Sequence, residues 1–428
     1  MKNIWMPQDQ VYWNLKPQQV STCTTDIVTD VAIIGGGMAG LSAAQAFQKK
    51  GKKVVLLEQY YCGSGASGKS SGFITPNAEL SLTDFAERYN MDAANQIWSF
   101  ITSGVEDIRK NILDNKFVCD YLPTDSLEVA SSKKDFNILE IEHNNLAKLG
   151  YNSEFYDSHS LTKQINCNSY FGGVVYKNTF GINGYLYCQE LKKALQNSGV
   201  DIYEETPVTA IEGHTLKTLH AQIKADYIIV CIDRFMPQLN LLTKDVYHAQ
   251  NFLLISEQLT DKQIHSIFPI KNYMTWDTEL IYNYFRITGD KRLLLGGGTL
   301  LSTYSSKTYH DYSYITRKLT KYLKNKFPFL KVQFEYQWPG LIGISKDIGP
   351  IAGTDKEKPY MYYISTAAGL PIAAALGRYS AEHLIDGRND LDSYFSPYRS
   401  FPIGGALQSI LGTKISFAIS NFVKKNVP

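Results

Sequence analysis

The chain of 428 residues has few features of a secreted, membrane-spanning or metal-binding protein. Its six cysteines include no Cys-x-x-Cys pair, and no histidine pair with metal-ligand spacing lies beside them, so we expect no metal site. No apolar run reaches the roughly 18 residues of a spanning helix. Residues 1–19 lack the apolar segment of a secretory signal, so we expect reduced thiols and a cytoplasmic location.

The charge of the chain is also nearly balanced. The formal net charge of +2 comes without a long basic run, which argues against nucleic-acid binding. The hydrophobic fraction of 44% is enough for large cores, and the length indicates two domains.

Residues 30–58, DVAIIGGGMAGLSAAQAFQKKGKKVVLLE, contain the strongest motif. An apolar run leads into Gly35, Gly37 and Gly40, and a helix-like stretch leads to a second apolar run that ends at Glu58. In a dinucleotide-binding unit the first glycine allows the tight turn, the second lets the backbone approach a pyrophosphate, and the third lets helix and strand pack closely. We therefore predict a dinucleotide site on the helix N-terminus. An acid at the end of the second strand favours FAD or NAD over NADP.

A second phosphate motif occurs at residues 63–70, GSGASGKS, which match the P-loop pattern letter for letter. The apolar run at residues 226–233 even ends in Asp233, as a Walker B strand would. However, four residues separate this loop from the preceding strand, and Gly72 and Pro76 interrupt any helix after it. A P-loop follows its strand directly and opens a long helix. A P-loop ATPase is therefore a weaker alternative, and we expect the loop to line the dinucleotide site instead.

A strand, a glycine turn and a helix recur late in the chain, where YMYYIST at residues 360–366 precedes AAGLPIAAALGRYSAEHLIDG. Units of this kind at both ends predict one parallel sheet built from both ends, with a second domain inserted between them. Helices are also expected at residues 84–116, 134–149, 184–199 and 311–326, and strands at residues 220–233, 246–256 and 280–300.

In several ordered segments the chain resembles the D-amino-acid-oxidase-like FAD-dependent oxidoreductases. The glycine fingerprint is followed by GASGKSSG at residues 65–72, which is similar to the family's GASGRNGG-like loop with Lys69 in place of the usual arginine. NYFRITGDKRLLLGGG at residues 283–298 resembles the YFR-x-x-x-D-x-R-L-L-x-G-G segment of the putrescine-oxidase branch. The family's late Gly-His-Gly differs, because this chain has Gly-Leu-Pro at residues 369–371.

The resemblance implies an α/β fold in which a discontinuous Rossmann-like FAD-binding domain carries an inserted substrate domain with a mixed, mostly antiparallel sheet. The expected segments are residues 30–85, 160–240 and 335–390 for the FAD-binding domain, residues 86–159 and 241–334 for the substrate domain, residues 1–29 for a lead-in and residues 391–428 for a tail. FAD is expected to be non-covalent, since some relatives use a late cysteine and none follows Cys231 here. The residues expected to contact FAD are Gly35, Gly37, Met38, Ala39, Gly40, Glu58, Gln59, Ser67, Gly68, Lys69, Ser70, Val208, Gly340, Gly369, Leu370 and Pro371.

The resemblance also implies oxidation of the C–N bond of a small amine or amino acid, by hydride transfer to flavin N5 and hydrolysis of the imine. Oxygen or a quinone would reoxidise the flavin. Arg286 is the candidate anchor for a substrate carboxylate, because its guanidinium fork matches that group; a structural ion pair, for example with Asp290, is the alternative. Tyr284 is a candidate lid or hydrogen-bond donor over the flavin, with core packing as its alternative. Trp276 and Tyr282 are weaker candidates.

Two other functions stay open at this point: a flavin monooxygenase reduced by NAD(P)H, and a flavin-binding protein without catalysis. The segment at residues 403–428 places apolar and small residues at helical spacing and includes Lys424 and Lys425. It can pack on the protein or on a dimer partner, or lie as an amphipathic helix on a membrane surface. The sequence leaves the oligomeric state and the substrate open.

Overall fold

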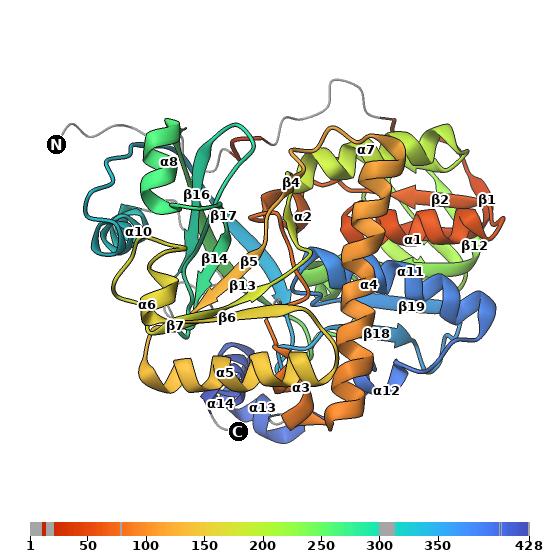
Figure 1. Cartoon of the computed structure of the whole chain (residues 1–428). Helices are drawn as coiled ribbons and strands as arrows, with labels where there is room; N and C mark the ends of the chain where they lie inside the picture. Colours follow the sequence, from red (N-terminus) through yellow and green to blue (C-terminus); the bar gives the residue numbers. More distant parts are fainter. Residues whose placement is uncertain are drawn as a thin grey trace.

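Two large mixed sheets, joined by a small one, form the protein (Figure 1). The computed structural model describes residues 11–13, 21–77, 79–298, 313–401, 403 and 405–426.

The first sheet has a parallel core that takes strands from both ends of the chain. Strand β1 (Ile27–Ile34) pairs in parallel with β2 (Val54–Leu57) on one side and β12 (Gln222–Val230) on the other, and β12 pairs in parallel with β19 (Met361–Ser365). The remaining strands of this sheet are β9 (Asp201–Tyr203), β10 (Ala210–Glu212), β11 (Thr215–Lys217) and β18 (Ile351–Thr354). All of β2 is buried, as expected of a parallel strand covered on both faces. This arrangement confirms the predicted sheet.

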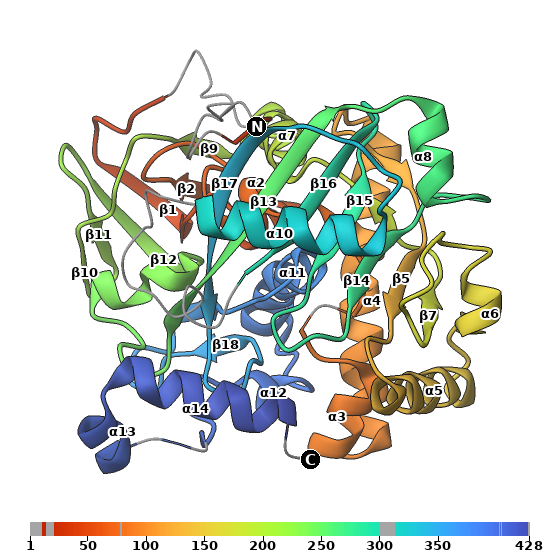
Figure 2. The same cartoon turned by 90° about the vertical axis from the view of Figure 1, so that its left-hand side faces the viewer.

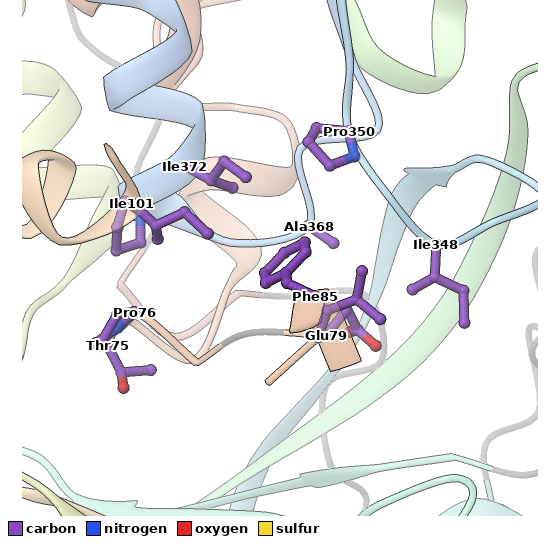
Figure 3. A pocket seen from close by; sticks show the side chains of 11 residues that line it. Thr75, Pro76, Glu79, Phe85, Ile101, Ile348, Pro350, Ala368 and Ile372 are labelled. Atoms are coloured by element: carbon purple, nitrogen blue, oxygen red, sulfur yellow. The ribbon is translucent and has the colours of Figure 1, made fainter. Parts of the chain in front are cut away.

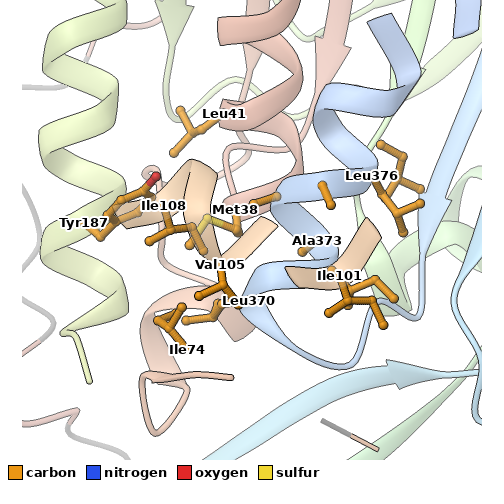
Figure 4. Packing of buried hydrophobic residues seen from close by; sticks show 14 of the residues in the cluster. Met38, Leu41, Ile74, Ile101, Val105, Ile108, Tyr187, Leu370, Ala373 and Leu376 are labelled. Atoms are coloured by element: carbon orange, nitrogen blue, oxygen red, sulfur yellow. The ribbon is translucent and has the colours of Figure 1, made fainter. Parts of the chain in front are cut away.

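Three helices pack together on this sheet: α1 (Met38–Lys49), α4 (Met91–Asn115) and α11 (Leu370–Asp386). Figure 4 shows their apolar side chains meeting, with Met38 and Leu41 from α1, Ile101 from α4 and Leu376 from α11. Two glycines make the approach close. A Cβ on Gly104 of α4 would lie 2.1 Å from the Pro371 carbonyl oxygen, and one on Gly377 of α11 would lie 2.4 Å from the Ala39 carbonyl oxygen. The helices therefore meet backbone to backbone.

The second sheet is mostly antiparallel, with the strand order β17-β13-β16-β15-β14-β5-β7-β6. Its strands are β5 (Ser126–Val129), β6 (Ser153–Asp157), β7 (Gly172–Tyr176), β13 (Tyr247–Gln258), β14 (Met274–Asp277), β15 (Tyr284–Ile287), β16 (Arg292–Gly297) and β17 (Phe334–Ile344). Helix α10 (Ser313–Lys326) covers the outer face, where Leu319 packs with Phe252 and Leu295 (Figure 2). The opposite face is directed toward the first sheet and its helices.

The elements that remain are short or peripheral. The small sheet joins β3 (Phe73–Ile74), β8 (Phe180–Gly181) and β4 (Leu122–Pro123). The other helices are α2 (Ala66–Lys69), α3 (Leu82–Arg88), α5 (Lys133–Lys148), α6 (Ser158–Leu161), α7 (Gly184–Asn197), the 3-10 helix η1 (Asp233–Leu239), α8 (Asp261–Ile267), α12 (Asp392–Phe395), α13 (Gly405–Leu411) and α14 (Thr413–Asn426). None of the helices in the described ranges is long and apolar enough to cross a membrane.

Several expected boundaries differ from the structure. The helix expected at residues 84–116 divides into α3 and α4, because the Asn90 side chain accepts a hydrogen bond from the Ala93 N–H and starts a new helix there. The two strands expected at residues 220–233 are one strand, β12. Residues 311 and 312 of the predicted helix lie outside the described ranges.

The domain division also needs different limits. Strands β7 and β17 were assigned to the FAD-binding segments at residues 160–240 and 335–390, yet both pair into the second sheet. Their partners are distant in the chain: β7 pairs with β5 and β6, and β17 with β13. We therefore propose that the two segments of the second domain, expected at residues 86–159 and 241–334, extend to residues 176 and 344.

The first two turns of the C-terminal helix α14, through Ser420, bury one side and expose the other. Ser416 and Phe417 are fully buried, and the Phe417 ring lies 5.4 Å from that of Tyr247 at the start of β13. Ile415 and Ile419 on the other side are 52% and 40% exposed. The tail therefore packs on the protein itself, which was one of the alternatives expected for this segment.

Candidate cofactor and substrate site

The glycine turn after β1 forms through close backbone contacts. Gly35 has a φ of 105°, and a Cβ there would lie 2.4 Å from the Cys231 carbonyl oxygen at the end of β12. A Cβ on Gly40 would lie 1.9 Å from the Gly35 carbonyl oxygen. Only glycine fits either place, because the first needs a left-handed backbone and the second allows no side chain between helix and turn.

The N-terminus of α1 meets the loop that imitates a P-loop. Gly37 caps the helix without a side chain, and the Met38 N–H donates to Ser67 Oγ at 2.9 Å. The Gly63 N–H donates to the Gly36 carbonyl oxygen at 2.9 Å. The loop therefore lies against the glycine turn, as expected if both line one phosphate site, and α2 within it is only four residues long.

Asp233, the acid that resembles a Walker B residue, has a different task. Its Oδ2 accepts a hydrogen bond from the Gly343 N–H at 2.6 Å, and its Oδ1 accepts one from the Thr366 N–H at 3.0 Å. Burial raises the pKa of this carboxyl group, and the backbone N–H donors lower it. The side chain joins β17 of the second sheet to the end of β19 in the first. Together with the short α2, this geometry argues against a P-loop ATPase.

Glu58 lies beside the same turn, directly after β2. Its Oε2 accepts a hydrogen bond from the Gly36 N–H at 2.7 Å, and its Oε1 accepts one from the Tyr60 N–H at 2.9 Å. Burial raises the pKa of Glu58, against the lowering effect of these N–H donors. Gln59 follows it and is half-buried, and Val208 is half-buried at the edge of the same sheet.

The other expected cofactor contacts lie at the start of α11 and on the second sheet. Gly369 has a φ of 137° and precedes Leu370 and Pro371, which open the helix. A Cβ on Gly340 of β17 would make only ordinary van der Waals contacts, the nearest at 3.9 Å. The adjacent Trp338 donates its indole N–H to the Lys69 carbonyl oxygen at 3.1 Å. The loop at residues 63–70 is thereby held between both sheets.

Arg286 is 1% exposed and uses its donors on the backbone of two distant segments. Its Nε donates to the Ser71 carbonyl oxygen and its Nη2 to the Ile182 carbonyl oxygen, each at 2.7 Å. The nearest carboxylate is Asp120, whose Oδ2 lies 3.9 Å from Nη1, and burial lowers the pKa of the guanidinium to about 10. The expected partner Asp290 was wrong, because that carboxylate binds Arg292. The geometry supports the structural role more than the substrate anchor.

Tyr284 is 7% exposed and belongs to a group of aromatic rings on the inner face of the second sheet. Its hydroxyl accepts a hydrogen bond from Asn251 Nδ2 at 2.9 Å. The ring contacts Phe73 at 5.9 Å and Tyr282 at 5.7 Å between centroids. Burial raises the pKa of Tyr284, so its hydroxyl stays protonated and can donate a hydrogen bond.

A pocket lies next to these rings, between the loop after β3 and the start of α11 (Figure 3). Its empty volume of about 360 Å³ includes space that is open to solvent. Thr75 and Glu79 line it from the loop, Ile101 from α4, and Pro371 and Ile372 from α11. The pocket therefore adjoins one of the two helix N-termini that were expected to hold the cofactor.

The sequence did not single out Glu128, on β5 of the second sheet. Its Oε2 accepts hydrogen bonds from Asn77 Nδ2 and from the Tyr176 hydroxyl, each at 2.9 Å. The signal was present but weak: in the strand Ser-Leu-Glu-Val, Glu128 is the single charged residue.

The fold and the glycine turn together define a two-domain, dinucleotide-binding oxidoreductase. Residues 30–383 match the model of the family described as FAD dependent oxidoreductase, and the chain belongs to this family. FAD is thus its cofactor. The residues present fit that group, because Gly37 leaves the N-terminus of α1 without a side-chain cap and the Ser67 hydroxyl faces it.

Relatives match over nearly the whole chain. Gamma-glutamylputrescine oxidoreductase of Escherichia coli is 28% identical over 398 residues, which cover 90% of this chain and 91% of that protein. The probable oxidoreductase OrdL of Haemophilus influenzae is 26% identical over 411 residues, which cover 92% of each. The crystal structure of glycine oxidase from Geobacillus kaustophilus superposes with a TM-score of 0.74 at 16% identity, covering 88% of this chain and all of that one. The last likeness shows a shared fold.

The role of Gly37 can be tested against a neighbouring glycine. We expect Gly37→Ala to lower the bound FAD per protein by a large factor, because the added Cβ lies 3.2 Å from Ser67 Oγ, where the backbone has to approach the pyrophosphate. Gly65→Ala is the matched control, since a Cβ there has nothing within 4 Å. The flavin-to-protein absorbance ratio after gel filtration measures both. Equal FAD retention in the two variants would contradict the assignment.

Proposed function

We propose that the protein oxidises the C–N bond of a small amine or amino acid. When bound, FAD supplies the two-electron chemistry by accepting a hydride from the substrate carbon at its N5, and the imine product then hydrolyses. The observation that carries the proposal is the pocket beside the start of α11, since Pro371, an expected cofactor contact, lines it from one side and Glu79, which accepts a hydrogen bond from Tyr282, from another. Two related proteins support it by name, as a gamma-glutamylputrescine oxidoreductase and a glycine oxidase.

The residues of the chain would bind FAD without a covalent bond. Cys62, whose thiol contacts the glycine turn at Gly36, is fully buried, and burial raises the pKa of this thiol well above the usual value. Such a thiol is a poor nucleophile. We propose that the contacts come from the sixteen residues named for FAD above. They lie on the glycine turn and α1, just after β2, on the loop at residues 63–70, before β10, on β17 and at the start of α11.

The second sheet would orient the substrate and exclude water. Tyr284 is held by Asn251 and by its neighbouring rings, so its position is fixed before substrate arrives. We propose it as a wall or hydrogen-bond donor of the substrate site. The electron acceptor in this proposal is oxygen or a quinone.

The proposed reaction has a direct test. Purified protein with its FAD, mixed without oxygen with a panel of amines and amino acids, is expected to lose its flavin absorbance with at least one compound. NADPH alone should leave the flavin oxidised; bleaching by NADPH would instead indicate a monooxygenase. If every compound leaves the flavin oxidised, the result would favour a flavin-binding protein without catalysis. Hydrolysis of ATP by the purified protein would support the P-loop ATPase alternative.

The two roles of Arg286 give different results on substitution. In Arg286→Lys the ammonium cannot reach both the Ser71 and Ile182 carbonyl oxygens, so we expect the free energy of unfolding to fall by about 2–4 kcal/mol. The KM for any substrate should change little. The control Arg292→Lys alters a partly exposed ion pair and should cost less than about 1 kcal/mol. Denaturant unfolding and steady-state kinetics are the measurements. Unchanged stability with a KM for amino acids raised tenfold or more would make Arg286 the carboxylate anchor.

We also propose a cytoplasmic protein with membrane contact at its tail. All six cysteines are free thiols, as is usual in a reducing compartment. The apolar side chains of the tail that face outward include Ile410, which is 80% exposed, and Ile415. Apolar residues on the outer side of an amphipathic helix can enter the lipid interface.

Vesicle binding tests the tail. We expect the wild type to sediment with phosphatidylglycerol vesicles, and the double variant Ile410→Ser, Ile415→Ser to sediment several-fold less. Leu113→Ser is the control, because Leu113 is 56% exposed on α4, away from the tail. Wild-type protein that stays in the supernatant would refute the contact.

A further inference from the structure

Glu128 lies on the inner face of the second sheet. Its strand neighbours Leu127 and Val129 point outward into the core under α10 and are fully buried. Glu128 keeps partial exposure although protein surrounds it, as expected for a side chain on a cavity. It pairs in register with Trp276 on β14, so the two side chains lie side by side on one face.

The carboxylate of Glu128 is held in a fixed place. The hydrogen bonds from Asn77 and from the Tyr176 hydroxyl end on the same atom, Oε2. Asn77 Nδ2 also lies 2.6 Å from that hydroxyl. The charge is therefore positioned by two elements from different parts of the chain, the loop after β3 and strand β7.

Aromatic rings continue from Glu128 to a second carboxylate. The ring of Trp276 stacks on Tyr176 at 5.9 Å between centroids and contacts Phe73 at 6.2 Å. Phe73 contacts Tyr284, which contacts Tyr282, and the Tyr282 hydroxyl donates to Glu79 Oε1 at 2.7 Å. Aromatic faces combined with carboxylates are the surroundings in which proteins hold organic ammonium groups.

The neighbouring pocket contains a polar group that needs a partner. Thr75 lines the pocket and is 5% exposed, and its Oγ1 has no hydrogen-bond partner within the described residues. A buried hydroxyl in this condition is costly unless a ligand or water completes it. Thr75 and Glu79 line this pocket together, and Asn77 on the same loop donates to Glu128, so the loop connects the pocket to both carboxylates.

The cation of this inner face, Arg286, is 1% exposed and held by backbone carbonyl groups. Its Nε and Nη2 donate to the Ser71 and Ile182 carbonyl oxygens, while Nη1 lies 3.9 Å from Asp120 Oδ2 and makes no hydrogen bond within the described residues. The groups that remain on this face near the pocket are therefore acidic and aromatic.

We propose that Glu128 and the aromatic rings beside it bind the ammonium group of the substrate. The substrate is then an aliphatic amine and not an α-amino acid that the protein holds by its carboxylate. This inference rests on the proposed amine oxidation and specifies its substrate. Glu128 then takes one proton: an N–H bond of the ammonium breaks, its electron pair stays on nitrogen, and an O–H bond forms on the carboxylate. The product is the neutral amine, from which a hydride can leave.

The protonation of Glu128 suits this task. Burial raises its pKa to about 7, while the hydrogen bonds from Tyr176 and Trp276 lower it. Glu142 of α5 and Asp84 of α3 raise it further through their charges. Glu79, whose carboxylate accepts a hydrogen bond from Tyr282, and Arg286 on β15 are further charged groups on this face. A group with a pKa near the working pH is an effective proton acceptor.

The pH dependence of binding tests the site without any substitution. The probe is tert-butylammonium, which cannot lose a hydride because its carbon next to nitrogen carries no hydrogen. Its dissociation constant for the FAD-loaded enzyme is read from the change in flavin absorbance. Affinity should be highest above pH 7, where Glu128 is ionised, and should fall about tenfold per pH unit below it. The neutral isostere tert-butanol should bind weakly at every pH.

Substitution gives the second measurement. Glu128→Gln keeps the acceptor for Asn77 and Tyr176 but removes the charge, so it should weaken tert-butylammonium binding roughly tenfold to a hundredfold and abolish the pH dependence. Glu140→Gln removes the same charge from an exposed position on α5 and should change neither. In single turnovers, pentylamine should reduce the wild-type flavin at least tenfold faster than norleucine, which is pentylamine with an added carboxylate.

The outcomes separate this inference from the proposed reaction. No binding of tert-butylammonium by the wild type, affinity independent of pH, or equal affinity in Glu128→Gln would overturn the ammonium site. If the Glu128→Gln variant loses its FAD, the pH dependence of tert-butylammonium binding to the wild type is the measurement that decides whether the ammonium site exists. A flavin that no amine or amino acid reduces, in an enzyme that still binds the cation in this pH-dependent way, refutes the reaction and leaves the site in place.

Discussion

The close approach of backbone to backbone at a few glycines is the constraint on which the structure depends. Gly40 lets α1 lie on the turn after β1, Gly377 lets α11 lie on α1, and Gly104 lets α4 lie on α11. Because of these contacts, the strand–turn–helix units from the two ends of the chain lie side by side. The N-terminus of α1, the loop that meets it and the start of α11 can then contribute to one cofactor site.

The second sheet adds the part of the site that a cofactor alone cannot supply. Its orientation is fixed by contacts that cross between the sheets: Asp233 on the N–H groups of Gly343 and Thr366, and Trp338 on the carbonyl of Lys69. The inner face thereby receives fixed rings and a fixed carboxylate. Rigid placement of this kind lowers the entropic cost of bringing a substrate to a reactive geometry.

Local patterns made the cofactor half predictable, since the glycine spacing and the apolar runs lie within about thirty residues and describe one physical unit. The substrate half depends on pairs that are distant in the chain. From the sequence, Arg286 was expected to be a buried cation paired with a carboxylate. Its hydrogen-bond partners are instead the carbonyl oxygens of residues 71 and 182, which no sequence pattern identifies. Glu128 was missed because its strand has four residues, and its importance comes from Asn77 and Tyr176 on other elements. The domain boundaries near β7 and β17 differ from the expected ones for the same reason, since the strands that pair with β7 and β17 are distant in the chain.

The parallel sheet also determines when the site can come into existence. Strand β1, which ends at residue 34, has β12 as its neighbour, and β12 needs β19 at residues 361–365. Such high contact order slows folding, because the chain loses the entropy of closing a loop of hundreds of residues before the stabilising contacts form. During synthesis at about 5–20 residues per second, the first glycine turn waits tens of seconds for its partners. The FAD site is therefore assembled only after nearly the whole chain has left the ribosome.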